Sequence, residues 1–223
     1  MVKLQFDPQS MPVESVAGEA MLPAERLQSD WLRARFQSPP DWQPEAMREH
    51  LLRNFTAEPT PAAVLIPLVM RDTGLSLLLT RRTAHLTDHA GQISFPGGRT
   101  ETHDASPIET ALRETEEEVG LQRQHVEVLG ALPEYFTGTG YVVSPVVGLV
   151  LPPFALQADV NEVAEVFEVP LSFLMNGMHH QRRTIALPNG AGHRTFYAMP
   201  YERHFIWGAT AGMLRNLYHF MRA

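Results

Sequence analysis

The feature that most constrains this chain is an acidic segment preceded by a proline and two glycines, Phe95–Leu121. Ser106 is a natural helix N-cap, and Glu109 lies three residues later, as in a capping box. Gly120 stands where a left-handed residue commonly ends a helix. The segment therefore predicts a tight glycine turn followed by a helix from about Pro107 to Val119.

One face of this helix is predicted to carry three carboxylates, because side chains at i, i+3 and i+4 lie side by side. They are Glu114, Glu117 and Glu118. Three adjacent carboxylates repel one another unless a cation lies among them, and hard oxygen donors suit Mg²⁺ or Mn²⁺. Arg113 is one turn before Glu117 and is expected to orient it by a charge-assisted hydrogen bond. The neighbouring stripe is predicted to face the core: Ile108, Leu112, Thr115 and Val119.

An acidic run by itself is more typical of a solvated helix surface, and the surrounding residues favour a functional interpretation. Residues 113–121 read Arg-Glu-Thr-Glu-Glu-Glu-Val-Gly-Leu. This resembles the second half of the Nudix box, G-x5-E-x7-R-E-U-x-E-E-x-G-U, in which U is a bulky aliphatic residue. Two positions depart from that pattern. Thr115 replaces the aliphatic residue, and the spacing from Gly98 to Arg113 is one residue longer, with Asp104 in place of the early glutamate.

The longer stretch 79–104 narrows the resemblance to one branch of that family. It is similar to the signature of the coenzyme A pyrophosphatases, L-L-T-x-R-(S/T)-x-x-L-x-x-H-x-G-x-(I/V)-x-F-P-G-G-x-x-(D/E)-x-x-D, which has the extra residue and the aspartate. Segments 139–148 and 161–171 also look like that branch. The resemblance covers about residues 60–215. It implies an α/β fold, with a mixed sheet in an α/β/α sandwich of the Nudix type. It also implies hydrolysis of coenzyme A or acyl-CoA to 3′,5′-ADP and (acyl-)4′-phosphopantetheine.

The resemblance also assigns roles to residues. The implied metal ligands are Glu114, Glu117, Glu118 and the backbone carbonyl of Gly98. Glu117 and Arg113 are the catalytic candidates on the helix, and Glu162 is the candidate general base, with Glu165 second. Glu101 and Asp104 are candidates for water-mediated ligands, and Asp104 is equally well interpreted as a capping aspartate.

Five residues are the candidates for binding the substrate: Arg81, Arg82, His85, His89 and Phe95. The two arginines suit the pyrophosphate or the 3′-phosphate by bidentate contacts, and one of them is expected to be structural only. The histidines lie in the signature loop. Phe95 has an alternative interpretation as a hydrophobic anchor for the glycine turn.

The rest of the pattern predicts strands with a few helices among them, a mixture that favours a mixed sheet between helices. A hairpin of two strands comes first, with a turn at Asp72–Gly74. The expected strands are Ala62–Met70, Leu75–Arg81, Val126–Leu132, Tyr141–Leu151, Glu165–Val169, Arg183–Leu187, Phe196–Pro200 and His204–Trp207. The expected further helices are Leu171–Leu174 and an amphipathic one at Gly208–Arg222.

Residues 1–60 look different, because prolines punctuate them and a single helix is expected at Glu45–Phe55. They are predicted to form an N-terminal extension to a hydrolase domain at 61–223. The extension is either a mobile arm or a dimer-forming element, so a homodimer is one of the expected states.

Composition excludes several classes of protein. The formal net charge is −7 and the chain has no basic tract, which argues against nucleic acid as a partner. There is no cysteine, so disulfides and thiolate metal sites are excluded. The longest apolar run is too short to span a bilayer. The expectation is a cytoplasmic protein with a small-molecule substrate and no membrane partner.

Two other functions stay open on the sequence. One is a Nudix pyrophosphatase for another nucleoside diphosphate derivative, such as ADP-ribose. The other is a Nudix domain that senses a nucleotide without cutting it. The sensor is disfavoured because such proteins usually lose one of the box carboxylates, and all three are present here.

Overall fold

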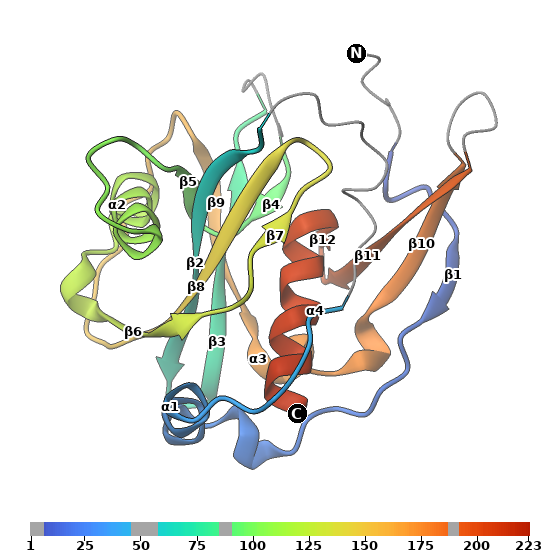
Figure 1. Ribbon diagram of the computed structural model, residues 1–223, viewed down its shortest axis with the longest axis horizontal. Helices are drawn as coiled ribbons and strands as arrows, with labels where there is room; N and C mark the ends of the chain where they lie inside the picture. Colours follow the sequence, from blue (N-terminus) through green and yellow to red (C-terminus); the bar gives the residue numbers. More distant parts are fainter. Residues whose placement is uncertain (1–6, 46–57, 85–90, 187–191) are drawn as a thin grey trace.

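The computed structural model describes residues 7–45, 58–84, 91–186 and 192–223. Within them the chain forms four layers, in the order α2, a large mixed sheet, α4 and a smaller antiparallel sheet (Figure 1). The strands are β1 (Val13–Val16), β2 (Thr60–Arg71), β3 (Gly74–Arg82), β4 (Ile93–Ser94), β5 (Gly97–Arg99), β6 (Val126–Ala131), β7 (Tyr135–Phe136), β8 (Tyr141–Val150), β9 (Val163–Pro170), β10 (Gln181–Ala186), β11 (His193–Tyr201) and β12 (His204–Trp207). The α-helices are α1 (Ser29–Gln37), α2 (Pro107–Val119), α3 (Leu171–Leu174) and α4 (Gly208–Arg222).

The large sheet has the path β4-β3-β2-β8-β6, with β9 paired to β3, β5 to β2 and β7 to β8. Its centre is the parallel pair of β2 and β8, while β2 and β3 form the predicted antiparallel hairpin. Both central strands are apolar on both faces because helices cover the sheet on either side. The predicted α/β class with a mixed sheet between helices is therefore confirmed.

The smaller sheet has the order β1-β10-β11-β12 and is antiparallel throughout. The last three of the predicted strands correspond to β10, β11 and β12. The sequence favoured a mixed sheet but did not assign these strands to it or to a second sheet, because alternation along a strand does not say which sheet the strand joins.

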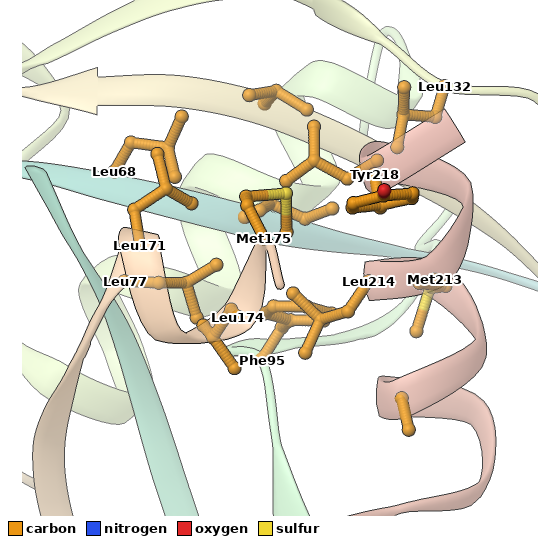
Figure 2. Close-up of a cluster of buried hydrophobic side chains, with 14 of the residues drawn as sticks. Leu68, Leu77, Phe95, Leu132, Leu171, Leu174, Met175, Met213, Leu214 and Tyr218 are labelled. Carbon is orange, nitrogen blue, oxygen red and sulfur yellow. The ribbon is translucent and has the colours of Figure 1, made fainter. Parts of the chain in front are cut away.

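The helix α4 lies between the two sheets, and most of its residues are buried. Its Leu214 and Tyr218 pack with Phe95 and Leu174 in the main core (Figure 2). The bounds predicted for this helix are confirmed, but its expected amphipathic exposure is not. A helix enclosed from several sides buries nearly its whole circumference.

The helix α2 covers the opposite face of the large sheet (Figure 1). The Ser106 hydroxyl accepts a hydrogen bond from the Glu109 backbone N–H at 3.3 Å, and Gly120 ends the helix with φ 70°. Both caps are as predicted. The core stripe was wrong at Ile108, which is exposed. Periodicity gives the angular position of a side chain but not where along the axis the buried contact begins.

The described part of the N-terminal segment packs on the rest of the chain. β1 pairs with β10, and Leu32 of α1 is fully buried in the main core. The interpretation of residues 1–60 as proline-punctuated missed α1, which lies in the proline-free stretch 24–38. Only Glu45 of the helix expected at 45–55 lies within the described residues.

One buried arginine ties this segment to α4. Arg215 donates to both carboxylate oxygens of Glu19, at 2.9 and 3.0 Å, and to Glu45 Oε2 at 3.0 Å. It also contacts Nδ1 of the fully buried His180, whose Nε2 lies 2.7 Å from the Leu174 carbonyl. Burial lowers the pKa of His180 to about 4, so this imidazole is neutral near pH 7 and accepts from Arg215.

None of the described helices is both long enough and apolar enough to cross a membrane.

Replacing Arg215 tests how much this contact stabilises the fold. The change Arg215→Met leaves Glu19 and Glu45 partly buried without their cation, so the free energy of unfolding is expected to fall by about 3 kcal/mol. Urea denaturation measures it. Arg222→Met, at an exposed position of the same helix, is the control, with an expected change of under about 0.5 kcal/mol. Equal effects of the two variants would contradict the assignment.

Candidate active site

The glycine turn and α2 lie so close that only glycine fits between them. β5 pairs with β2, and a Cβ atom on Gly97 would come within 2.4 Å of the Ala63 carbonyl oxygen. A Cβ on Gly98 would lie 2.4–2.5 Å from the carboxylate of Glu114. The Gly97 backbone N–H donates to Glu118 Oε2 at 3.2 Å. The sequence thus places backbone polar groups directly against the acidic face of the helix.

Arg113 holds this arrangement together. Its guanidinium forms a two-point contact with Asp104, with both N–O distances 2.9 Å, and it also donates to the Arg99 carbonyl at 3.1 Å. The remaining nitrogen, Nη1, is shared by Glu114 and Glu117 at 3.0 Å each. The contact between Arg113 and Glu117 that the sequence predicted is present. The Arg113 guanidinium also holds the pKa of Asp104 well below its usual range.

The three glutamates differ in burial along the helix face. The side chain of Glu118 is 5% exposed, that of Glu114 17% and that of Glu117 60%. Burial raises the pKa of Glu118 to about 7, and the charges of Glu114 and Glu162 act in the same direction. Burial also raises the pKa of Glu114, against the favourable effect of Arg113. A carboxylate whose charged form is disfavoured in this way gains the most from an added cation.

Glu162 lies close enough to act on this cluster, since its charge raises the pKa of both Glu114 and Glu118. Its own side chain is exposed. The loop that carries it is fixed at both ends. The Asp159 N–H donates to the Glu118 carbonyl at 2.9 Å, and the Thr83 N–H donates to the Glu162 carbonyl at 2.9 Å. These two hydrogen bonds fix the loop to the end of α2 and to the residue that follows β3.

The two consecutive arginines at the end of β3 point to opposite faces of the sheet. Arg82 Nη1 lies 3.4 Å from Glu118 Oε1, on the side of α2. Arg81 Nη2 lies 3.0 Å from Glu165 Oε2, on the other side. Glu165, the second candidate base, is also paired with Arg203 and lies 3.3 Å from His204. The structure therefore brings Arg82 to the acidic cluster and separates Arg81 and Glu165 from it.

Phe95 does not line this site. The residue is 2% exposed and packs in the main core with Leu174 and Leu214 (Figure 2). A ring buried on both faces has no surface for a ligand, so the assignment of Phe95 to substrate binding is corrected to that of an anchor beneath the glycine turn. His85 and His89 lie outside the described residues.

The donor set fits a hard divalent cation. Glu114, Glu117 and Glu118 supply carboxylate oxygens on one helix face, Glu114 lies against the Gly98 backbone, and burial disfavours the charged forms of Glu114 and Glu118. Within the described ranges, no three carboxylate or imidazole groups already converge as a ready-made metal site. Arg113 Nη1 instead lies 3.0 Å from both Glu114 and Glu117.

Asp104 accepts hydrogen bonds from Arg113 and from the Glu101 backbone N–H, so it is a loop aspartate that positions Arg113. The sequence left such a structural role open beside that of a water-mediated ligand. The signal in the sequence was that Asp104 stands in place of the early glutamate of the Nudix box pattern. Nothing in the sequence indicated the arginine and histidine that join Glu165, because β3, β9 and the β11–β12 turn are far apart along the chain.

The chain is similar in sequence to known proteins. A family model described as "NUDIX domain" matches residues 59–184. A protein named "Uncharacterized Nudix hydrolase NudL" from Escherichia coli O139:H28 (strain E24377A / ETEC) is 43% identical over 86% of this chain and 93% of its own length. The protein of that name from Escherichia coli (strain K12) is 46% identical over 70% of this chain and 80% of its own length. The solved structure of a Nudix hydrolase from M. smegmatis, RenU, is 23% identical over 52% of this chain and 73% of its own, with a TM-score of 0.44.

The close approach of Gly98 to Glu114 gives a direct test of the cation site. In Gly98→Ala the new methyl group displaces the Glu114 carboxylate, so Mn²⁺ affinity is expected to fall on the order of 10-fold. Titration calorimetry with Mn²⁺ measures this. The melting temperature, read in the absence of metal, checks that the fold is retained. Unchanged Mn²⁺ affinity in a folded variant would remove Glu114 from the ligand set.

Proposed function

The chain belongs to the Nudix hydrolase family, and from that membership we propose that it hydrolyses the pyrophosphate bond of coenzyme A or an acyl-CoA. The products are 3′,5′-ADP and 4′-phosphopantetheine or its acylated form. One water is consumed. Its oxygen bonds to one phosphorus as the bridging P–O bond breaks, and the water's protons pass to a base and to the departing phosphate.

The proposal rests on the acidic face of α2 and on Arg113, which binds Asp104, Glu114 and Glu117. The Gly97 backbone N–H donates to Glu118, and the Glu114 carboxylate lies where a side chain on Gly98 would be. Asp104 matches the aspartate in the signature of the coenzyme A branch, in which the spacing between the glycine and the arginine of the box is one residue longer. Its two-point contact with Arg113 gives that position a physical purpose here. Fold similarity alone does not support a choice of substrate.

We assign Glu114, Glu117, Glu118 and the Gly98 carbonyl to holding Mg²⁺ or Mn²⁺. When bound there, such a cation neutralises the phosphate oxygens and lowers the pKa of a bound water. Glu162 is exposed on a loop fixed beside the cluster and is free to take the proton of the attacking water. Arg82 lies beside Glu118 and orients a pyrophosphate oxygen toward the cluster.

Product analysis with coenzyme A and Mg²⁺ tests the reaction. The wild-type protein is expected to release 3′,5′-ADP, and Glu117→Gln is expected to lower kcat on the order of 100-fold, because it removes a charged oxygen donor. The matched control is Glu116→Gln on the same helix. Glu116 points away from the cluster and binds Arg123, so the control should retain activity within about twofold.

The other outcomes separate the rival functions. Cleavage of ADP-ribose with coenzyme A left intact would keep the pyrophosphatase and overturn the substrate assignment. Tight binding of nucleotide without any cleavage, with either Mg²⁺ or Mn²⁺, would favour a sensor.

The base assignment has its own test. Glu162→Gln is expected to lower kcat on the order of 100-fold, because the amide cannot accept the proton of the attacking water. Mn²⁺ affinity should stay within about threefold, since Glu162 is not assigned as a ligand. A parallel loss of Mn²⁺ affinity would instead make Glu162 part of the metal site.

A further inference from the structure

A cavity of about 410 Å³ lies on the side of the large sheet opposite α2, where the end of β3 meets β4 and β12. Its walls include Arg81, Arg203, His204, Phe205, Trp207 and Asp7. The volume is in the range of pockets that hold small ligands. A larger hollow of about 610 Å³ near Gly120 has Arg123 in its wall, but Glu109 and Glu116 already bind that arginine.

The two arginines that line the cavity have more hydrogen-bond donors than the carboxylate they share can accept. Arg81 and Arg203 share the single carboxylate of Glu165. Two guanidiniums carry about ten N–H donors, whereas one carboxylate accepts about four hydrogen bonds. Side chains of both arginines are well exposed, 48% for Arg81 and 76% for Arg203, so their remaining donors face solvent. This is a fork arrangement suited to a phosphate.

The aromatic residues in the cavity wall suit an aromatic base. Phe205 and Trp207 come from β12 and are half-buried, and Trp207 is itself packed edge-on against Phe196. The carboxylate of Asp7 adds an acceptor for an amino group. It is fixed by the Gln9 backbone N–H at 2.9 Å. A phosphate on the arginines and an amino-bearing aromatic ring on the aromatic residues together describe an adenosine carrying a phosphate.

The walls are held in place by contacts outside the cavity. The His204 ring stacks on Phe167, with centroids 3.7 Å apart and planes 4° from parallel. Arg183 donates to the carbonyls of Gln9 and Met11 at 2.8 Å each, which fixes the N-terminal wall. Glu202, which precedes Arg203 in the β11–β12 turn, has φ 51°, an uncommon conformation for a residue other than glycine. Such strain is retained where surrounding contacts determine it.

We propose that this cavity binds the adenosine 3′-phosphate end of the substrate, with Arg81 and Arg203 on the 3′-phosphate and Trp207 against the base. The inference rests on the proposed function. Arg81 and Arg82 are consecutive at the end of β3, with Cα atoms about 3.8 Å apart. A ligand lying across that strand end contacts Arg82 and the acidic cluster with its pyrophosphate, and Arg81 and the cavity with its nucleoside. One substrate molecule thereby contacts both faces of the sheet at the end of β3.

Calorimetry with two nucleotides tests this without requiring turnover. The wild-type protein, with Mg²⁺, is titrated with adenosine 3′,5′-bisphosphate and separately with adenosine 5′-monophosphate. The bisphosphate is expected to bind at least about 10-fold more tightly, because a charge-assisted contact to the extra phosphate is worth that much. In Arg203→Gln this ratio is expected to fall to about threefold or less. Trp207→Leu should weaken both nucleotides alike.

The matched control is Arg71→Gln. Arg71 is also an exposed arginine paired with a β9 glutamate, Glu168, but it lies at the other end of the sheet and outside the cavity. It should keep the wild-type ratio. A wild-type protein with no preference for the bisphosphate, or a folded Arg203→Gln that keeps the preference, would overturn the proposal. Bisphosphate preference in a protein that leaves coenzyme A uncut would support the cavity and refute the proposed reaction.

Discussion

The site depends on one cation, the guanidinium of Arg113. Three glutamates on one helical face repel one another, and two of them lose hydration through burial against the sheet. Arg113 offsets this by bonding to Glu114 and Glu117 while Asp104 fixes its orientation from the loop before the helix. In the glycine turn, the Glu114 carboxylate occupies the space that a side chain at Gly98 would fill. Without the arginine the same sequence would place unbalanced negative charge in a partly buried site.

Burial gives chemically identical side chains different properties. Glu118 lies nearly out of solvent beneath Gly97, whereas Glu117 is mostly exposed. A buried, hydrogen-bonded carboxylate keeps its position, while an exposed one can move to meet a ligand. Glu162 extends the group from a loop that is fixed to both α2 and β3. The acidic cluster therefore combines a buried, hydrogen-bonded carboxylate with exposed ones.

Other elements pack on the face of the large sheet opposite α2 (Figure 1). The buried helix α4 lies between the two sheets, and its Arg215 holds the N-terminal segment through Glu19 and Glu45. The same segment, through its contact with Arg183, provides a wall of the cavity beside β12. Residues before the hydrolase motif thus contribute to the surface next to the site. The boundary predicted near residue 60 stays a prediction.

The sequence by itself determined what is local in the chain. Caps and periodicity fixed the bounds of α2, and alternation with turn residues gave most strands, because hydrogen bonding and side-chain direction within one element depend on neighbouring residues. The spacing of the three glutamates also followed from helix geometry. Tertiary structure alone decided which face each arginine of β3 serves, how deeply each glutamate is buried and that Phe95 is core. It also decided that Arg203 and His204 meet Glu165. These contacts join segments far apart along the chain, and pairing between strands, not local pattern, sets them.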